Sequence, residues 1–392
     1  MSADVLTLEE PLLKDRPPAA TREAQDRGTL KLPENLKIVS TDGHWEIAED
    51  IFYQGFPASL KHEAPRVWFD RYWHCGYPDR LPKDPESLRI EDLVAGILEL
   101  SVPSGAWDLD LRIKQQDIEG IQQEIVYPQS LLAFTRHPDL AVQERVYRIY
   151  NEYMAHVFSS APNRYFGVGV CSNWWEPSKA KEAIRQIVDL GLKTFMLPTS
   201  NAGKTLDGRL ISYGGQEMDL FWDEVAAADI PVAFHVGENA AFHSRGAHGS
   251  YLLQTMSPFR KPLGELIFGG VFDRHPNLKV VFAEGGIAWV PAALQDAETI
   301  YDAHGALLDV LPKHRPCHYW HQNCFATFQN DLLGLRLLDY IGADRVMWAA
   351  DYPHNEGSLG YTWDSLDSVV RMTGEKQARK ILGETASALY RI

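Results

Sequence analysis

Short apolar runs recur along the chain from Leu36 onward and alternate with stretches of helical period. Eight of these runs have the length of strands: 36–42, 123–129, 164–170, 193–199, 230–236, 278–284, 323–329 and 345–351. Most are continuous apolar runs rather than strict alternations of apolar and polar residues. Because a parallel strand covered on both faces has no polar side, this pattern predicts buried parallel strands.

Helical patterns fill the intervals between these runs, most clearly at 177–191, 215–229, 262–276 and 291–305. In the first of them one face carries Ala180, Ile184, Ile187 and Val188, and Gly191 stands where the helix should end. A strand followed by a helix, repeated eight times, predicts an α/β protein with a (β/α)8 TIM barrel. The alternative, an open doubly wound sheet, is weakened because no strand is followed by a glycine-rich phosphate loop.

The stretches outside this repeat predict the domain organisation. Residues 1–34 are rich in charge, proline and alanine, so we expect an N-terminal arm that is disordered or lies on a partner subunit. Residues 35–392 should form the barrel, which carries the candidate metal ligands described below. The first crossover is about twice the usual size, so residues 46–115 are expected to form a cap insertion over the barrel mouth, after the first strand.

Composition limits the partners of this chain. It has 392 residues, of which 45% are hydrophobic and 23% charged, and its formal net charge is −15. There is no basic block, so neither nucleic acid nor an anionic membrane surface is expected as a partner. The N-terminus lacks the pattern of a signal peptide, and no apolar run reaches membrane-spanning length. A cytoplasmic protein with a small-molecule substrate is the expectation.

Polar side chains stand at the ends of predicted strands, which is where TIM barrels carry their function. Asp42 and His44 end the first strand, His235 ends the fifth and Asp351 ends the eighth. In a closed barrel the first and eighth strands are neighbours and the fifth faces them, so these side chains should converge. Two carboxylates and two imidazoles suit Zn²⁺, Mn²⁺ or Fe²⁺. The alternative for Asp42 and His44 is a mere hydrogen bond between them.

The order of these motifs resembles the amidohydrolase superfamily. "DGH" follows the first strand, "FH" lies on the fifth, "HPNLKVVFAEGG" spans the sixth and "DYPH" follows the eighth. More narrowly, the set is similar to the branch that contains aminocarboxymuconate semialdehyde decarboxylase and the benzoate decarboxylases. The resemblance runs from about Leu36 to the C-terminus.

The resemblance implies one divalent metal ion, with zinc expected and manganese or iron as alternatives. Asp42, His44, His235 and Asp351 match the ligands of the mononuclear relatives, although the family often has His or Glu where Asp42 stands. Binuclear relatives carry a modified lysine at the end of the fourth strand. Here Lys193 lies at the opposite end of that strand, which favours one ion over two.

Glu284 is the clearest departure from the family, because the related decarboxylases have a catalytic histidine near this position. We interpret Asp351, Glu284 and His354 as candidate catalytic groups. A structural ion pair is the alternative for Glu284, and packing of a turn is the alternative for His354.

Three further residues are candidates for binding the substrate. Trp45 would line a pocket beneath the cap, and Arg245 and Arg260 would bind a substrate carboxylate. The alternative for both arginines is solvent-facing charge on a loop.

These residues predict a metal-dependent hydrolase that uses metal-activated water on a small aromatic or carboxylate-bearing substrate. The missing histidine places this prediction ahead of its alternative, a metal-dependent non-oxidative decarboxylase of a hydroxyaromatic or muconate-like acid. A non-catalytic metal-binding barrel is the second alternative. The resemblance also implies a homodimer or a higher homo-oligomer.

Overall fold

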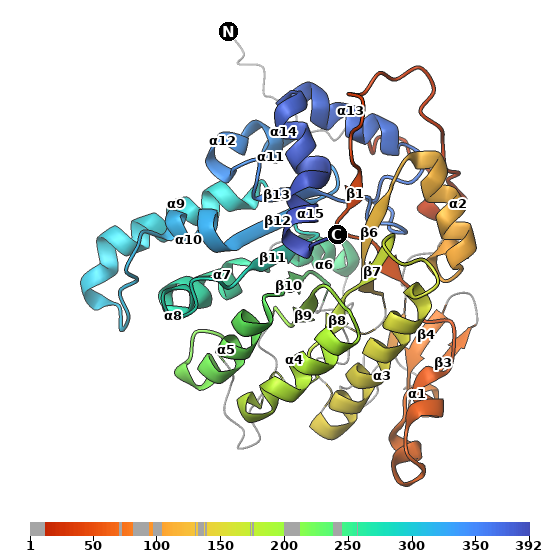
Figure 1. Cartoon of the computed structure of the whole chain (residues 1–392), viewed down its shortest axis with the longest axis horizontal. Coiled ribbons are helices and arrows are strands. Elements are labelled where there is room, and N and C mark those ends of the chain that lie inside the picture. The colour runs from red at the N-terminus through yellow and green to blue at the C-terminus, as the bar shows by residue number, and fades with distance from the viewer. Residues whose placement is uncertain are drawn as a thin grey trace.

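The structure, a computed structural model, shows strands in the middle of the molecule and helices around them (Figure 1). It describes residues 12–69, 73–80, 94–96, 104–129, 131, 137, 139–172, 174, 176–199, 212–237, 245–256 and 258–392. None of the helices in these ranges is long and apolar enough to cross a membrane.

Every predicted strand segment contains a strand. They are β1 (Val39–Ser40), β6 (Gln123–Pro128), β7 (Tyr165–Gly167) with β8 (Gly169–Val170), β9 (Phe195–Leu197), β10 (Val232–His235), β11 (Val280–Ala283), β12 (Cys324–Phe328) and β13 (Val346–Trp348). The third segment is divided because the chain changes neighbours at Val168. The N–H of Val168 donates to Val126 on one side, and the N–H of Gly169 donates to Thr194 on the other.

The strands pair in parallel, in the order expected for the barrel. β6 lies between β1 and β7, and β8 to β13 follow one another in chain order. The first and last segments also meet, because the N–H of Thr41 donates to the carbonyl of Trp348 at 3.1 Å and Gly43 pairs with Tyr352 in a parallel bridge. The α/β class with a parallel sheet is therefore confirmed.

Helices follow the strands along the chain. The described ones are α1 (Ile51–Gly55), α2 (Leu109–Glu119), α3 (Leu140–Phe158), α4 (Ala180–Asp189), α5 (Asp219–Ala228), α6 (Ala247–Thr255), α7 (Arg260–Phe268), α8 (Val271–Arg274), α9 (Trp289–His304), α10 (Pro316–Asn323), α11 (Leu332–Arg336), α12 (Leu338–Ile341), α13 (Thr362–Thr373), α14 (Glu375–Arg379) and α15 (Thr385–Tyr390). Asp108 and Asp139 cap α2 and α3 by accepting hydrogen bonds from first-turn amides.

Two details of the helices differ from the sequence prediction. The predicted helix 262–276 divides into α7 and α8 at a glycine pair, where Gly270 has a left-handed φ of 68°. Of the residues predicted on the buried face of α4, Ala180, Ile184 and Ile187 are buried, whereas Val188 is 43% exposed. The buried face of α4 is therefore the predicted one without Val188.

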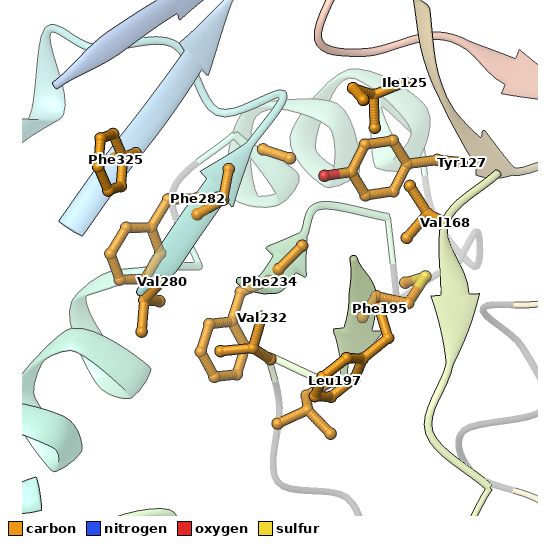
Figure 2. Close-up of a cluster of buried hydrophobic side chains, with 14 of the residues drawn as sticks. Ile125, Tyr127, Val168, Phe195, Leu197, Val232, Phe234, Val280, Phe282 and Phe325 are labelled. Atoms are coloured by element: carbon orange, nitrogen blue, oxygen red, sulfur yellow. The ribbon is translucent and has the colours of Figure 1, made fainter. Parts of the chain in front are cut away.

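Aromatic side chains join the sheet to its helices. Phe234 of β10 stacks on Phe282 of β11 with ring centroids 6.0 Å apart (Figure 2). Phe282 also meets Trp289 of α9 at 5.5 Å and Trp320 of α10 at 6.3 Å. These rings cover the helix-facing side of the sheet. Because side chains alternate along a strand, the residues next to Phe234 and Phe282 face the opposite side.

The segment that contains the predicted cap has its own small sheet. After β2 (His44–Trp45) and α1, the strands β3 (Arg66–Phe69), β4 (Trp73–Gly76) and β5 (Val94–Gly96) pair antiparallel in that order. Asp50 ties α1 to this sheet, since its carboxylate accepts hydrogen bonds from the Arg66 side chain and the Val67 N–H. Helix α2 begins within the range 46–115 that the sequence predicts for the cap. The boundaries of the cap stay a prediction.

Glu119, at the end of α2, gives the chain a predicted pH dependence of stability. Its buried carboxylate accepts hydrogen bonds from the Gly360 N–H at 2.5 Å and the Thr362 hydroxyl at 2.7 Å. Burial nevertheless raises the pKa of Glu119 from 4.5 to about 7. Between these two values the folded chain keeps a proton that the unfolded chain has lost, so this contribution to stability falls as pH rises.

The test is to compare the wild type with Glu119→Gln in thermal melts from pH 4.5 to pH 7.5. The variant cannot titrate here, so the melting temperature of the wild type relative to the variant should fall by roughly 2–5 °C across the window. A difference that does not change with pH would show that Glu119 is ionised throughout.

Candidate functional site

Six candidate residues lie at the C-terminal ends of the strands. They are Asp42 after β1, His44 at the start of β2, His235 at the end of β10, Glu284 after β11, Asp351 after β13 and His354 three residues further on. The first five are at most 5% exposed, and the side chain of His354 is 13% exposed. Five buried ionisable groups and one partly buried histidine thus lie at one end of the sheet.

The side chains of these residues converge. The Nε2 atom of His44 lies 3.4 Å from Asp351 Oδ1 and 3.6 Å from Asp42 Oδ1. The Nε2 atom of His235 lies 3.3 Å from Asp42 Oδ1 and 3.0 Å from Glu284 Oε2. One ligand atom each from Asp42, His44, His235 and Glu284 lies within 4.8 Å of all the others. Three of the four predicted ligands thus group with Glu284, and the fourth, Asp351, belongs to a second such group with His44, Glu284 and His354.

Several of these buried atoms have no hydrogen-bond partner among the described residues. They are Oδ2 of Asp42, Nε2 of His44 and both carboxylate oxygens of Asp351. Leaving such atoms unpaired is costly, and more so for charged groups. A divalent cation between them would satisfy them together, and imidazole and carboxylate are ordinary ligands of zinc and manganese. The donor set thus fits a metal ion.

The other nitrogen of each histidine ligand is positioned by the backbone. The Nδ1 atom of His44 lies 3.3 Å from the carbonyl of Pro128, and Nδ1 of His235 lies 2.9 Å from that of Val236. Because a carbonyl can only accept, each Nδ1 donates and leaves the Nε2 lone pair for the cluster. Metal-binding histidines are commonly oriented in this way.

The pKa values reflect burial and the crowding of charge. Burial raises the pKa of Asp42 to about 7 and lowers that of His44. Burial alone would also lower the pKa of His235, but the carboxylates of Asp42 and Glu284 outweigh it and raise the value to about 9. These shifts show that the carboxylates of the cluster favour positive charge beside them, and a divalent ion supplies such a charge.

Glu284 and His354 form a second part of the cluster. The Nδ1–H of His354 donates to Glu284 Oε1 at 3.1 Å, and its Nε2–H donates to the side-chain oxygen of Gln129 at 3.1 Å. Nδ1 also lies 3.0 Å from Asp351 Oδ1, so both ring nitrogens face oxygen atoms, an arrangement that an imidazolium satisfies. Burial opposes this charge, but the Asp351 and Glu284 carboxylates raise the pKa of His354 well above its ordinary value. The His354 ring also stacks on His44, with centroids 4.1 Å apart.

The backbone at the two strand ends is unusual. Glu284 and Asp351 have left-handed φ angles of 70° and 50°, which non-glycine residues seldom adopt. The N–H of Glu284 donates to the hydroxyl of Thr327 at 2.9 Å, and the N–H of Asp351 donates to the carbonyl of Asp42 at 3.0 Å. Such conformations often occur at functional sites, where the surrounding structure maintains them.

Sequence reasoning missed residues that support this cluster. Gln129 stands at the end of the second predicted strand, so a search for amides as well as titratable groups at strand ends would have found it. Arg112 of α2 gave no local signal, yet it is fully buried. Its guanidinium donates to Glu124 at 2.8 Å and to the carbonyl of His44 at 2.9 Å, which holds the backbone of a candidate ligand.

Three predicted substrate-binding residues do not join the cluster. Trp45 packs in the core, with its indole N–H donating to the Tyr153 hydroxyl, because the residue after His44 points to the opposite face of the chain. Arg260 begins α7, is half exposed and pairs with Asp296 of α9. Arg245 is exposed just before α6. Trp45 and Arg260 thus have contacts within the protein, and a role of the three residues in substrate binding stays a prediction.

The fold and the site together define a class: an α/β protein with parallel strands and a candidate metal centre at their carboxyl ends. Comparison with known proteins agrees with this class. The Amidohydrolase family profile matches residues 106–392. Because this match covers most of the chain, the protein belongs to the amidohydrolase superfamily.

Named relatives place the chain near decarboxylases of that superfamily. It is 25% identical over 304 residues to 2-amino-3-carboxymuconate-6-semialdehyde decarboxylase of Dictyostelium discoideum, covering 76% of this chain and 81% of that one. It is 24% identical over 314 residues to gamma-resorcylate decarboxylase of Rhodococcus jostii, covering 74% and 92%. The recognised resemblance to the aminocarboxymuconate semialdehyde decarboxylase branch is therefore confirmed.

Solved structures support the fold. An amidohydrolase from Mycobacterium avium subsp. paratuberculosis superposes with a TM-score of 0.72 at 19% identity, over 91% of this chain and all of that one. A dihydroxybenzoic acid decarboxylase from a Polaromonas species, with bound manganese and the inhibitor 2-nitroresorcinol, gives a TM-score of 0.63 at 17% identity, over 91% and 97%. At these identities the likeness shows the fold alone.

Proposed function

We propose that this protein is a metal-dependent, non-oxidative decarboxylase of a hydroxyaromatic or muconate-like acid. The observation that carries the proposal is the buried cluster, in which Asp42, His44 and His235 group with Glu284, and Asp351 groups with His44, Glu284 and His354. Several atoms of this cluster lack a hydrogen-bond partner among the described residues, and a cation would satisfy them. Relatives that act as decarboxylases favour this reaction over the hydrolysis that the sequence analysis placed first. The preference for hydrolysis is corrected accordingly.

In this proposal one divalent ion is held by Asp42, His44, His235 and Asp351. When bound, such an ion polarises a substrate oxygen and stabilises negative charge that develops on it. Lys193 precedes β9, at the strand end away from the cluster, which supports one ion rather than two. Manganese is the metal bound in a structural neighbour, whereas the expected zinc has no such support and stays a prediction.

Glu284 and His354 are the proposed proton-transfer groups. When the bond to the carboxylate breaks, its electron pair stays on the ring or alkene carbon, and that carbon must take up a proton. The imidazolium of His354 holds a proton 3.1 Å from Glu284 Oε1, and Glu284 reaches the ligand His235. Glu284 is thus placed to pass a proton between His354 and a reactant beside the metal.

The closed barrel and its cap are part of the same proposal. The strand order and the contacts of β1 with β13 support a closed (β/α)8 barrel. The antiparallel sheet of β3, β4 and β5 is the proposed cap, which would cover the substrate. The cytoplasmic location and the homo-oligomer also stay predictions.

Hydrolysis is kept as a second candidate because of one observation. Glu284 stands where the resemblance leads us to expect a histidine, and a carboxylate can accept a proton from water as well as donate one. A non-catalytic metal-binding barrel is the remaining alternative, and it requires that no substrate be turned over.

The proposal is tested with purified, manganese-loaded protein. We expect about one tightly held ion per chain by elemental analysis and release of carbon dioxide from a member of a panel of hydroxybenzoates and muconate derivatives. The panel also contains lactones and amides. Hydrolysis of one of these without any carbon dioxide release would replace the proposal by its alternative, and two tightly held ions would overturn the mononuclear assignment.

A further inference from the structure

The described part of the N-terminal arm lies along the loop that carries His354. The guanidinium of Arg22 donates to the carbonyl of Gly357 at 2.9 Å and to that of Asn355 at 2.6 Å. The N–H of Ala19 donates to the side-chain oxygen of Asn355 at 2.8 Å, and Ala19 is only 2% exposed. Figure 1 shows the arm passing close to α13 and α2. The arm therefore touches this loop on its own chain.

Further contacts attach the arm on either side of Arg22. The guanidinium of Arg16 lies 4.5 Å from the centre of the Tyr361 ring, and that of Arg22 lies 5.7 Å from it. Glu119 of α2 accepts a hydrogen bond from the Gly360 N–H, and the nearby backbone of Gln25 in the arm lowers the pKa of this carboxyl. The arm and the end of the loop thus both lie beside Glu119.

The opposite side of the loop faces the metal cluster. The loop is closed at its base, where the N–H of Ser358 donates to the carbonyl of Ala350 at 2.8 Å. Between these residues lie Asp351 and His354. A side chain at Gly357 would come within 2.3 Å of the Asp351 carbonyl, so the loop is packed tightly against itself. A shift of the Asn355 and Gly357 carbonyls, which contact the arm, would therefore also move Asp351 and His354, which face the cluster.

We propose that the arm is an intramolecular strap and that Arg22 is a positioning residue for the His354 loop. One guanidinium bridges two carbonyls that lie one and three residues beyond His354. It thereby limits the movement of the imidazole that contacts Glu284 and stacks on His44. That the arm restrains the loop does not depend on the proposed function. That this restraint supports turnover rests on the proposed function.

The first test measures amide hydrogen exchange in the full-length, manganese-loaded protein. Arg22→Gln removes the bridge, so the amides of His354, Gly357 and Ser358 should exchange roughly tenfold faster. Arg27→Gln is the matched control, because Arg27 donates to the arm's own carbonyls at Leu30 and Leu32. Unchanged exchange in Arg22→Gln, or an equal change in the control, would overturn the strap.

The second test separates positioning from general stability by a double-mutant cycle. Arg22→Gln should lower kcat about 5- to 30-fold, with metal content and KM little changed. In a His354→Gln background the same change should cost nothing further, because Arg22 acts through His354. Independent, multiplicative losses would overturn the positioning role, as would full activity of Arg22→Gln.

The two tests keep this inference apart from the proposed function. If a lactone or amide is the substrate, the cycle is run on that reaction, and only the decarboxylase proposal fails. If nothing is turned over, the proposed function and the catalytic role of Arg22 both fall, while the exchange experiment still decides whether the arm restrains the loop.

Discussion

Replacing His235 with alanine is expected to remove both the metal and the activity while the protein stays folded. His235 contributes an Nε2 atom that lies within 3.3 Å of two carboxylates in the cluster. Removing even a partner of a metal ligand costs 10- to 100-fold in affinity or activity, so loss of a ligand should lower kcat by more than about 100-fold. Elemental analysis and steady-state kinetics measure the two effects.

The control is the same substitution at His275, which is also buried but lies before β11, at the other end of the sheet. There it contacts Asp219 and Asp223 of α5 rather than the cluster. His275→Ala should lower the melting temperature and leave metal content and kcat near the wild-type values. Full metal loading and normal turnover of His235→Ala would show that the ligands have been assigned to the wrong residues.

Glu284→Gln is expected to keep the metal and lower kcat by roughly 10²–10⁴-fold, the usual contribution of a general acid or base. Glutamine keeps the size of the side chain and can still accept the hydrogen bond from His354, but it cannot carry a proton between His354 and a reactant. Because binding groups are retained, KM should change far less than kcat. The measurements are metal content, kcat and KM on the substrate found in the panel.

Glu265→Gln is a matched control, since Glu265 lies on α7 and accepts a hydrogen bond from the N–H of Tyr213. It should leave kcat unchanged. Normal turnover in Glu284→Gln would make Glu284 a structural residue. Loss of metal would instead make Glu284 a fifth ligand, as its place in the cluster also permits.

Much of the fold could be predicted from local sequence patterns. Buried strands need apolar side chains on both faces, so continuous apolar runs such as 278–284 and 345–351 predict strands. Asp351 and His235 were found because a parallel barrel brings strand ends together, a rule that needs no knowledge of distant contacts. The predicted convergence of Asp42, His44, His235 and Asp351 depends on that rule alone.

The limits of prediction appear where a side chain's direction depends on packing. The sequence predicts Trp45 in a pocket beneath the cap but does not show that its indole N–H donates to the Tyr153 hydroxyl of α3. It offers a substrate carboxylate or solvent-facing charge for Arg260 but does not show the pairing with Asp296 of α9. The position of a charged residue in the sequence does not show which helix will pack beside it.

By itself, the sequence determined the alternation of strands and helices and the polar residues that end the strands. Only the tertiary structure decided which of those residues work together. His354 meets Gln129 across 225 positions of the chain, and Arg22 meets Gly357 across 335. Hydrophobic periodicity records whether a residue is buried, but a hydrogen bond between distant residues depends on where the whole chain places its two partners.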